Sequence, residues 1–375
     1  MSFPYDGTGF EPSRSFTIGT SDYTDRVTRW PKISRKSNQF KSANVKVALA
    51  NTDGHFNTFY NNVYTIPNTC TLTCDSYTLY VGFLQDVQYS REKCTVTLRD
   101  RLSDLEVLKI GDSNNVISFA PQIPSDIAWT LCTCYGGLDS TTSSSNTDID
   151  YTMFSLWAET FSSDSVTVEA NYDGQKITKA LESLAKMTDS DIWISRDGKL
   201  KFKSRFDVAS NDTTVDEPYV IDMSINIDQD RLTNKQYVYG AYSSDNSDWS
   251  LVKFSQDQAS INSYGLHESI IKDEHVWYQS SVYAGVIADK MILQFKNPVK
   301  EYTVRTPFTH INTTLSDRVR LVDSFFSIDS AEAWRVVAEK IDMDNGEIEF
   351  ELDGAQSFEP FYLDVSNLDG NYYLL

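Results

Sequence analysis

The chain of 375 residues is long enough for two or three domains with buried cores. Its 53 acidic and 33 basic residues give a net charge of −20. This balance argues against a surface that coats nucleic acid, because such a surface needs a basic footprint.

Aromatic residues, at 13% of the chain, and frequent β-branched residues favour a strand-rich fold, and the first part of the chain carries strand signals. Residues 1–20 are polar and contain glycine and proline, so we expect an arm. Apolar residues alternate over residues 45–49, and an Asp-Gly pair then supplies a tight turn. Further short strands are predicted at residues 79–83, 87–89 and 94–98. Together they predict the arm and a small antiparallel β-barrel over residues 1–117.

The next segment changes to a helical period. Ser125 can cap a helix that ends at a Gly-Gly pair, and a second helix follows an Asp-Gly turn. A hairpin with an Asp-Gly tip is expected over residues 192–202. These signals predict a compact α+β insert over residues 118–206.

Strand signals return after a polar connection at residues 207–217. Residues 260–265 are expected to form an extended piece that ends in a glycine turn. The best helix signal follows, because apolar side chains recur at every fourth position from Tyr283 to Phe295, with Ser280 or Ser281 as the cap. Strands are predicted at residues 223–227, 237–242, 251–254, 299–304, 319–322 and 334–338, with a last hairpin over 338–352.

The predicted fold class is therefore mainly β with an α+β insert, in which two antiparallel β-barrel domains flank a smaller α+β domain. The second barrel spans residues 207–355 and carries the covering helix at about residues 280–296. An apolar C-terminal tail follows at residues 356–375. The two β parts look like one plan used twice, although no residue-level repeat is visible.

No motif predicts an enzyme or a cofactor. The four histidines are scattered, and neither a GxGxxG nor a GxxxxGK[ST] phosphate loop occurs. The Asp342–Gly346 stretch is better explained as a hairpin turn than as a calcium loop, because a calcium loop would place Ile341 where a carboxylate is required. Asp148 and Asp150 are expected to be solvated acids of a loop.

Five cysteines, an odd number, argue against a closed disulfide framework. Their spacing also fits a shared metal ion poorly, since i and i+2 positions of a helix point to different sides and an extended i to i+4 pair lies about 13 Å apart. We therefore predict structural thiols and no metal, with an iron–sulfur or metal site as the alternative. The candidate ligands of that alternative are Cys70, Cys74, Cys94, Cys132 and Cys134.

No targeting segment and no membrane-spanning segment is visible in the sequence. The N-terminus lacks a basic region followed by an apolar one, and the most apolar window, residues 282–295, is too short to span a bilayer. We expect a soluble protein made in a cytoplasm.

Taken together, several pieces of sequence resemble the baseplate or tail hub proteins of tailed bacteriophages, the family that closes the end of the tail tube. Each piece is weak alone, but their order over about 320 residues is more specific. The pieces are residues 45–56, 79–84, 124–127, 135–138, 197–202, 260–265, the helix that ends at Pro298, and the hairpin of residues 334–352.

The resemblance implies a homotrimer with two tail-tube-like β-barrels in each chain, so that three chains form a pseudo-sixfold ring. Such a ring would join the six-fold tail tube to a three-fold tip or spike and give passage to double-stranded DNA during ejection. The implied partners are the tail tube protein, distal tail or baseplate proteins, the tape measure protein and a tip, spike or fibre protein. The implied location is the virion, after assembly in the host cytoplasm.

Two other functions stay open at this point. One is a receptor- or glycan-binding tail module, which the 21 tyrosines favour. The other is a tail-associated cell-wall hydrolase. A three-fold ring with a central pore would separate the hub from both.

The C-terminal tail is too apolar to be a free solvated segment, so it should be buried on protein. Docking on its own chain is one alternative, and the other is that it crosses to another subunit or anchors the tip protein. The residues expected at this interface are Phe358, Phe361, Tyr362, Leu363, Tyr372, Tyr373, Leu374 and Leu375.

Overall fold

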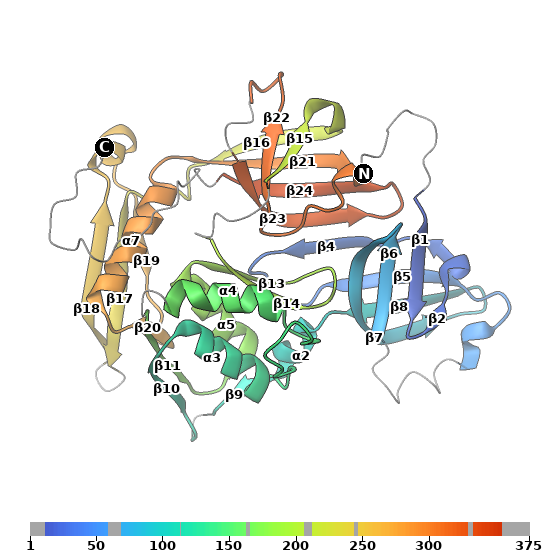
Figure 1. Ribbon diagram of the computed structural model, residues 1–375, viewed down its shortest axis with the longest axis horizontal. Coiled ribbons are helices and arrows are strands. Elements are labelled where there is room, and N and C mark those ends of the chain that lie inside the picture. The colour runs from blue at the N-terminus through green and yellow to red at the C-terminus, as the bar shows by residue number, and fades with distance from the viewer. Residues whose placement is uncertain are drawn as a thin grey trace.

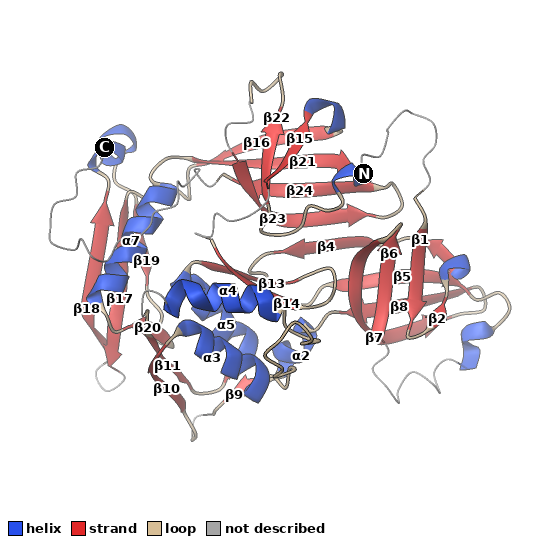
Figure 2. Cartoon of the chain, in the orientation of Figure 1, coloured by secondary structure: helices blue, strands red, loops and turns tan. Residues whose placement is uncertain are grey.

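The computed structural model describes residues 12–58, 69–112, 114–162, 166–205, 212–243, 247–328 and 333–354 (Figures 1 and 2). Three large sheets and a group of helices make up this part of the chain. No helix in the described ranges is both long and apolar enough to cross a membrane.

The first sheet is antiparallel and has the order β2-β1-β6-β7-β8-β5-β3. Two predicted strands, at residues 79–83 and 87–89, are in fact one long strand, β7 (Tyr77–Tyr89). A register shift between Leu84 and Asp86 lets this strand bend without ending. The other strands are β1 (Arg14–Ile18), β2 (Ser21–Asp22), β3 (Val27–Arg29), β5 (Asn44–Ala50), β6 (Thr69–Cys74) and β8 (Lys93–Arg99).

The second sheet has the order β15-β22-β23-β24-β21-β16, and β4 (Lys32–Lys36) from the start of the chain also pairs with β23. The polar connection predicted at residues 207–217 is wrong, because its second half forms β15 (Asp212–Asp216), parallel to β22. Val215 is the residue of this strand that enters the core. The other strands are β16 (Asp222–Asp228), β21 (Val299–Pro307), β22 (Arg318–Val322), β23 (Ala333–Asp342) and β24 (Glu347–Asp353).

The third sheet combines strands from the insert with strands after residue 207, in the order β10-β11-β20-β17-β18, with β19 also paired to β17. Helix α7 (Ser281–Phe295) lies along β17 and β18 (Figure 1). The predicted cap is confirmed, since the Ser280 side chain accepts a hydrogen bond from the Val282 amide. The strands are β10 (Ile117–Gln122), β11 (Val168–Tyr172), β17 (Lys235–Ser243), β18 (Asp248–Gln256), β19 (Glu268–Ile271) and β20 (Val276–Tyr278).

Two local predictions around helices are wrong. Residues 260–264 are not extended but belong to helix α6 (Gln258–Tyr264), which begins because the Asp257 carboxylate caps the Ser260 amide and ends at Gly265, the glycine expected to end this segment. The first insert helix, α3 (Pro124–Thr130), begins at its proline and is followed by a π-helical turn, η3 (Leu131–Tyr135). Ser125 therefore lies inside this helix and does not cap it.

Helix α4 (Tyr151–Ser162) was not expected, although its aromatic residues face the insert core. The other predicted insert helix is confirmed as α5 (Ile177–Thr188), and the predicted hairpin as β13 (Ser190–Ile194) and β14 (Leu200–Ser204). The remaining short elements are α2 (Leu102–Val107), β9 (Lys109–Ile110), β12 (Gln175–Lys176), η1 (Thr24–Arg26), η2 (His55–Thr58), η4 (Glu217–Tyr219) and η5 (Phe308–His310).

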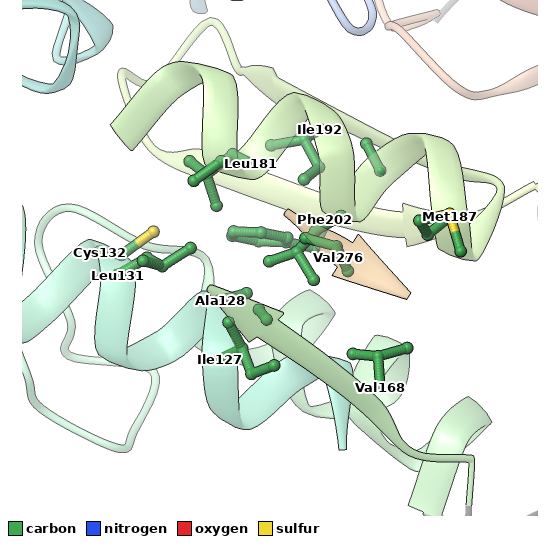
Figure 3. Packing of buried hydrophobic residues seen from close by; sticks show 14 of the residues in the cluster. Ile127, Ala128, Leu131, Cys132, Val168, Leu181, Met187, Ile192, Phe202 and Val276 are labelled. Atoms are coloured by element: carbon green, nitrogen blue, oxygen red, sulfur yellow. The ribbon is translucent and has the colours of Figure 1, made fainter. Parts of the chain in front are cut away.

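The buried side chains form two cores. One joins the insert to α7 and the third sheet, and Figure 3 shows its centre, where Phe202 lies among Leu181, Ile192 and Val276. The other is shared by the first and second sheets, which we call the two half-barrels, and the two half-barrels therefore pack as one unit. The expected fold class, mainly β with two barrel-like β parts and an α+β insert, is confirmed. Three pairings cross the domain limits expected from sequence: β4 with β23, β9 with β12, and β11 with β20.

Candidate functional site

A buried ion junction holds the two half-barrels and the insert together. Glu339 on β23 lies between two guanidinium groups, with Arg35 Nη1 3.0 Å from Oε1 and Arg196 Nη2 2.5 Å from Oε2. Arg35 comes from β4, and Arg196 from the tip of the β13–β14 hairpin. The side chains of all three residues are at most 8% exposed. Three distant segments of the chain therefore meet at one carboxylate.

The same two arginines also bind backbone carbonyls of neighbouring elements. Arg35 donates to the Leu79 oxygen of β7, and Arg196 donates to the oxygens of Ile311 and Thr313. Burial alone would raise the pKa of Glu339, but the charges and hydrogen bonds of Arg196 and Arg35 outweigh it and hold the pKa below its usual value. Glu339 is therefore an ionised group inside the protein.

A second charged cluster lies where β24 ends. Asp353 is 3.0 Å from Arg231 and 3.3 Å from Arg335. Arg335 also faces the buried Asp191, which is bound by Arg205 at 3.1 Å. An open cavity of about 480 Å³ adjoins this cluster and is lined by charges of both signs, among them Arg205, Arg231 and Asp353. This mixed lining matches a bracing network between strands better than a site for a ligand of one charge.

The five candidate metal ligands fall into two separate regions. Cys70 and Cys74 on β6 and Cys94 on β8 are buried in the core shared by the half-barrels. Burial raises the pKa of the Cys70 and Cys74 thiols to about 12 and that of Cys94 to about 11. Cys132 and Cys134 lie in η3, the first buried and the second exposed. In the described part of the chain, no three Cys, His, Asp or Glu residues gather as a metal site would require.

The expectation that Asp148 is a solvated loop acid is wrong. Its carboxylate is buried, lies 2.8 Å from Arg101 and accepts the Asp139 amide hydrogen bond at 2.9 Å. Asp150 is half-buried and lies 3.3 Å from Lys201. Both acids close the loop before α4, because a buried carboxylate needs a partner.

The hairpin at Asp342–Gly346 is confirmed. The Asp342 carboxylate accepts hydrogen bonds from the amides of Asp344 and Asn345, and Gly346 has a φ of +70°. Lys32 lies 2.6 Å from the same carboxylate and satisfies its charge.

One face of the third sheet is aromatic and exposed. It lies on β17, β18 and β19, on the side opposite the buried Gln236, Val238 and Gly240, and we call it the aromatic face. Exposed fractions reach 58% for Phe254, 54% for Ile270 and 46% for Val252. The aromatic face comprises Tyr237, Tyr239, Trp249, Val252, Phe254 and Ile270.

The sequence predicted the strands of this face. We did not predict from it that every second side chain of β17 would be partly exposed and form an aromatic face. Tyr237 and Tyr239 alternate with buried residues on β17, and this period-two pattern was the available signal. The ion junction was also missed. Its signal was an acid, Glu339, directly after the apolar run of residues 336–338.

The interface residues predicted in the C-terminal tail, from Phe358 to Leu375, lie outside the described residues. Their role as an interface stays a prediction.

No protein-family model and no curated protein sequence matches this chain. Solved structures do match it. The tail protein from Neisseria meningitidis MC58 has a TM-score of 0.58 at 13% identity, over 92% of this chain and 97% of that one. Prophage tail protein gp18 from Listeria monocytogenes EGD-e has a TM-score of 0.56 at 13% identity, over 92% and 96%.

The 43 kDa tail protein of prophage MuSo2 from Shewanella oneidensis has a TM-score of 0.54 at 16% identity, over 91% of this chain and 98% of that one. These likenesses extend over nearly the whole of each chain, including both half-barrels and the insert. They confirm at the level of fold the resemblance found in the sequence. The protein therefore has the fold of phage tail proteins.

Proposed function

We propose that this protein is a structural component of a phage tail, at the baseplate or tail tip, and that it has no catalytic role. The observation that carries the proposal is the pair of half-barrel sheets packed on one core, in a chain that matches phage tail proteins over nearly their full length. Because these matches cover 92% of this chain, we assign no described segment to a separate hydrolase domain.

The finer proposal is a homotrimeric hub. Three chains would supply six half-barrels, enough for a pseudo-sixfold ring that joins a six-fold tail tube to a three-fold tip or spike. The partners of such a ring are the tube, distal tail or baseplate, tape measure and tip proteins, and its place is the virion after assembly in the host cytoplasm. A net charge of −20 suits passage of DNA, since an acidic lumen repels phosphates instead of holding them.

The edge of the second sheet supports a ring contact. Strand β16 is the last strand on one side of this sheet, and Ile227 on it is 57% exposed. An exposed edge strand with apolar side chains is a template for pairing with another chain. We assign β16 to the contact between neighbouring subunits.

Electron microscopy of the purified chain, alone and in assembled tails, tests the hub. We expect three-fold rings with a central pore, and an Ile227→Glu variant should form fewer of them. Leu156→Glu is the matched control, because Leu156 is 56% exposed and lies on helix α4, not on a strand. A monomer in assembled tails, or equal loss of rings in both variants, would contradict the proposal.

A further inference from the structure

The aromatic face is a large apolar surface that the described chain leaves uncovered. Helix α7 lies on the other side of β17 and β18, where Val238 is buried. On the open side, Phe254 packs against Tyr237 with ring centroids 5.8 Å apart, yet remains 58% exposed. A contiguous exposed patch of this kind on a protein surface marks a binding site.

Two lysine ammonium groups lie against the rings of this face. The Lys235 ammonium lies 4.9 Å from the centre of the Tyr237 ring, and the Lys272 ammonium lies 5.5 Å from that of Tyr239 and 5.4 Å from that of Trp249. Lys235 is also paired with Glu268 at 3.0 Å. A protein of net charge −20 thus presents cations among aromatic rings at this place. The chemistry fits a segment that is apolar and acidic.

Residues 355–375 of the same chain have this composition. They contain three acids, Glu359, Asp364 and Asp369, and no lysine or arginine. Around these acids lie the phenylalanine, tyrosine and leucine residues that the sequence predicts to be buried. Charge and apolar character therefore both match the aromatic face.

The point where the described chain stops is close to this face. Asp353 is held by Arg231, which is four residues before Lys235, the first residue of β17. A Cβ on Gly354 would touch the Lys300 backbone, just after α7. The 21 residues beyond Gly354 can span about 70 Å when extended, whereas the nine residues of β17 cover about 30 Å. The segment can reach and cross the face of its own chain.

We propose that residues 355–375 dock on the aromatic face of the same chain. Their aromatic and leucine side chains cover Tyr237, Phe254 and Ile270, and their acids lie beside Lys235 and Lys272. The segment then links the last strand of the second sheet to the third sheet, and so joins the two cores of the molecule. Of the two alternatives that the sequence leaves open for the tail, this proposal selects its own chain, and it does not depend on ring formation.

Hydrogen–deuterium exchange on the full chain tests the docking. We expect the amides of residues 355–375 to exchange at least about tenfold more slowly than in a free peptide of the same sequence. A Tyr237→Ser/Phe254→Ser variant should lose most of this protection, and Lys272→Glu should lose part of it. Phe325→Ser is the matched control, because Phe325 is 84% exposed at a site remote in sequence from the third sheet, and it should keep full protection.

Absence of protection in the unaltered chain, or equal protection in the Tyr237→Ser/Phe254→Ser variant, would overturn the proposal.

A photo-cross-linking residue at position 254 identifies the occupant directly, in a mixture of isotopically heavy and light chains. Cross-links to residues 355–375 within chains of one isotope support docking on the same chain. Cross-links between heavy and light chains would show that the tail binds a neighbouring copy. Saturable binding of a glycan to the aromatic face would show that the face binds a receptor. Either result contradicts the proposal.

Discussion

Glu339 is the side chain of the buried ion junction that pairs with both of its arginines. It balances two buried guanidinium groups that come from the start and the middle of the described chain. Removing one partner from such a set leaves charge buried without compensation, which costs much more than the net benefit of an exposed ion pair. The stability of the junction should therefore depend on this carboxylate.

We predict that Glu339→Gln lowers the free energy of unfolding by about 3–5 kcal/mol, because both Arg35 and Arg196 lose their counter-charge. Urea denaturation followed by tryptophan fluorescence measures the change. Glu351→Gln is the control, since the Glu351–Lys36 pair has side chains 49% and 55% exposed and its loss should leave the midpoint nearly unchanged. Equal effects of the two substitutions would contradict the role of the junction.

The same carboxylate predicts a pH dependence. Its pKa in the folded chain is lower than the ordinary value of 4.5, so its stabilisation is complete above pH 4.5 and is lost as the pH falls through the folded-state pKa. The difference in urea midpoint between the unaltered chain and Glu339→Gln should thus be constant from pH 5 to 7 and shrink below pH 4.5. If the difference in urea midpoint grew as the pH fell, the prediction would be contradicted.

The cysteines give a second prediction at this scale. Burial raises the thiol pKa of Cys132 to about 12 and also raises the thiol pKa of the three cysteines in the first sheet, whereas Cys134 is exposed. Because the thiolate is the reactive species, a disulfide reagent should modify one thiol per native chain and five after unfolding. Cys134→Ser should abolish the native reaction. Rapid reaction of two or more thiols, or one equivalent of bound iron or zinc, would contradict structural thiols.

Residue roles were the least predictable level from sequence. Periodicity identifies which positions face a core, but a charged residue at such a position carries no signal about its partner. Glu339 and Arg35 are 304 positions apart, and Asp148 meets Arg101 from across a loop. Only the tertiary arrangement decides whether such a charge is solvated or paired.

At the level of elements, two backbones approach each other closely where β17 meets β20. Gly240 pairs with Tyr278 there, and a Cβ on Gly240 would lie 2.4 Å from the Tyr278 carbonyl oxygen. Tyr278 is fully buried in the insert core, so it cannot move aside without cost. This glycine allows β17 to pair with β20, which pairs on its other side with β11 of the insert.

We predict that Gly240→Ala destabilises the chain by about 1–3 kcal/mol, as overpacking of a core does. Gly285→Ala is the matched control in α7, where the added methyl group has no neighbour within 4 Å. That change should instead stabilise by about 0.5–1 kcal/mol, because alanine is the better helix former. Thermal denaturation of both variants distinguishes the effects, and a stabilising Gly240→Ala would show that the strands can separate freely.

Elements with strong apolar periodicity and clear end signals were predictable from sequence. Elements that depend on a neighbouring strand or on a single capping contact were not. Helix α7 has a cap, a stripe and a proline stop, and its limits match. Strand β15 has one core residue, Val215, and forms only because β22 lies beside it. Helix α6 depends on the Asp257 cap, which outweighed the extended interpretation of its apolar residues. Pattern alone cannot supply a neighbouring strand.

For the whole molecule, the alternation of β-rich and helical segments was enough to predict the fold class. The spacing of apolar residues that marks a strand or a helix is visible within a short stretch of sequence. How the parts share cores was not predictable. The sequence divides at residues 117 and 206, whereas one core takes side chains from both half-barrels and the other from the insert and β17–α7. Such sharing arises from contacts between segments hundreds of residues apart.

The shared core predicts that the two half-barrels unfold together. Ile348 on β24 is fully buried in the same core as Cys70, Cys74 and Cys94 of the first sheet. Ile348→Ala should cost about 2–5 kcal/mol through lost burial and the cavity left behind. If the sheets form one cooperative unit, this loss in the second sheet also destabilises the first.

Thiol labelling in increasing urea, in a chain that also carries Cys132→Ser and Cys134→Ser, measures this coupling directly. The three remaining thiols all belong to the first sheet, so their reaction reports only on its opening. We expect Ile348→Ala to lower the urea concentration at which they react, by the same amount as it lowers the fluorescence midpoint. Labelling at an unchanged urea concentration would mean that the half-barrels are independent domains, despite the side chains they share.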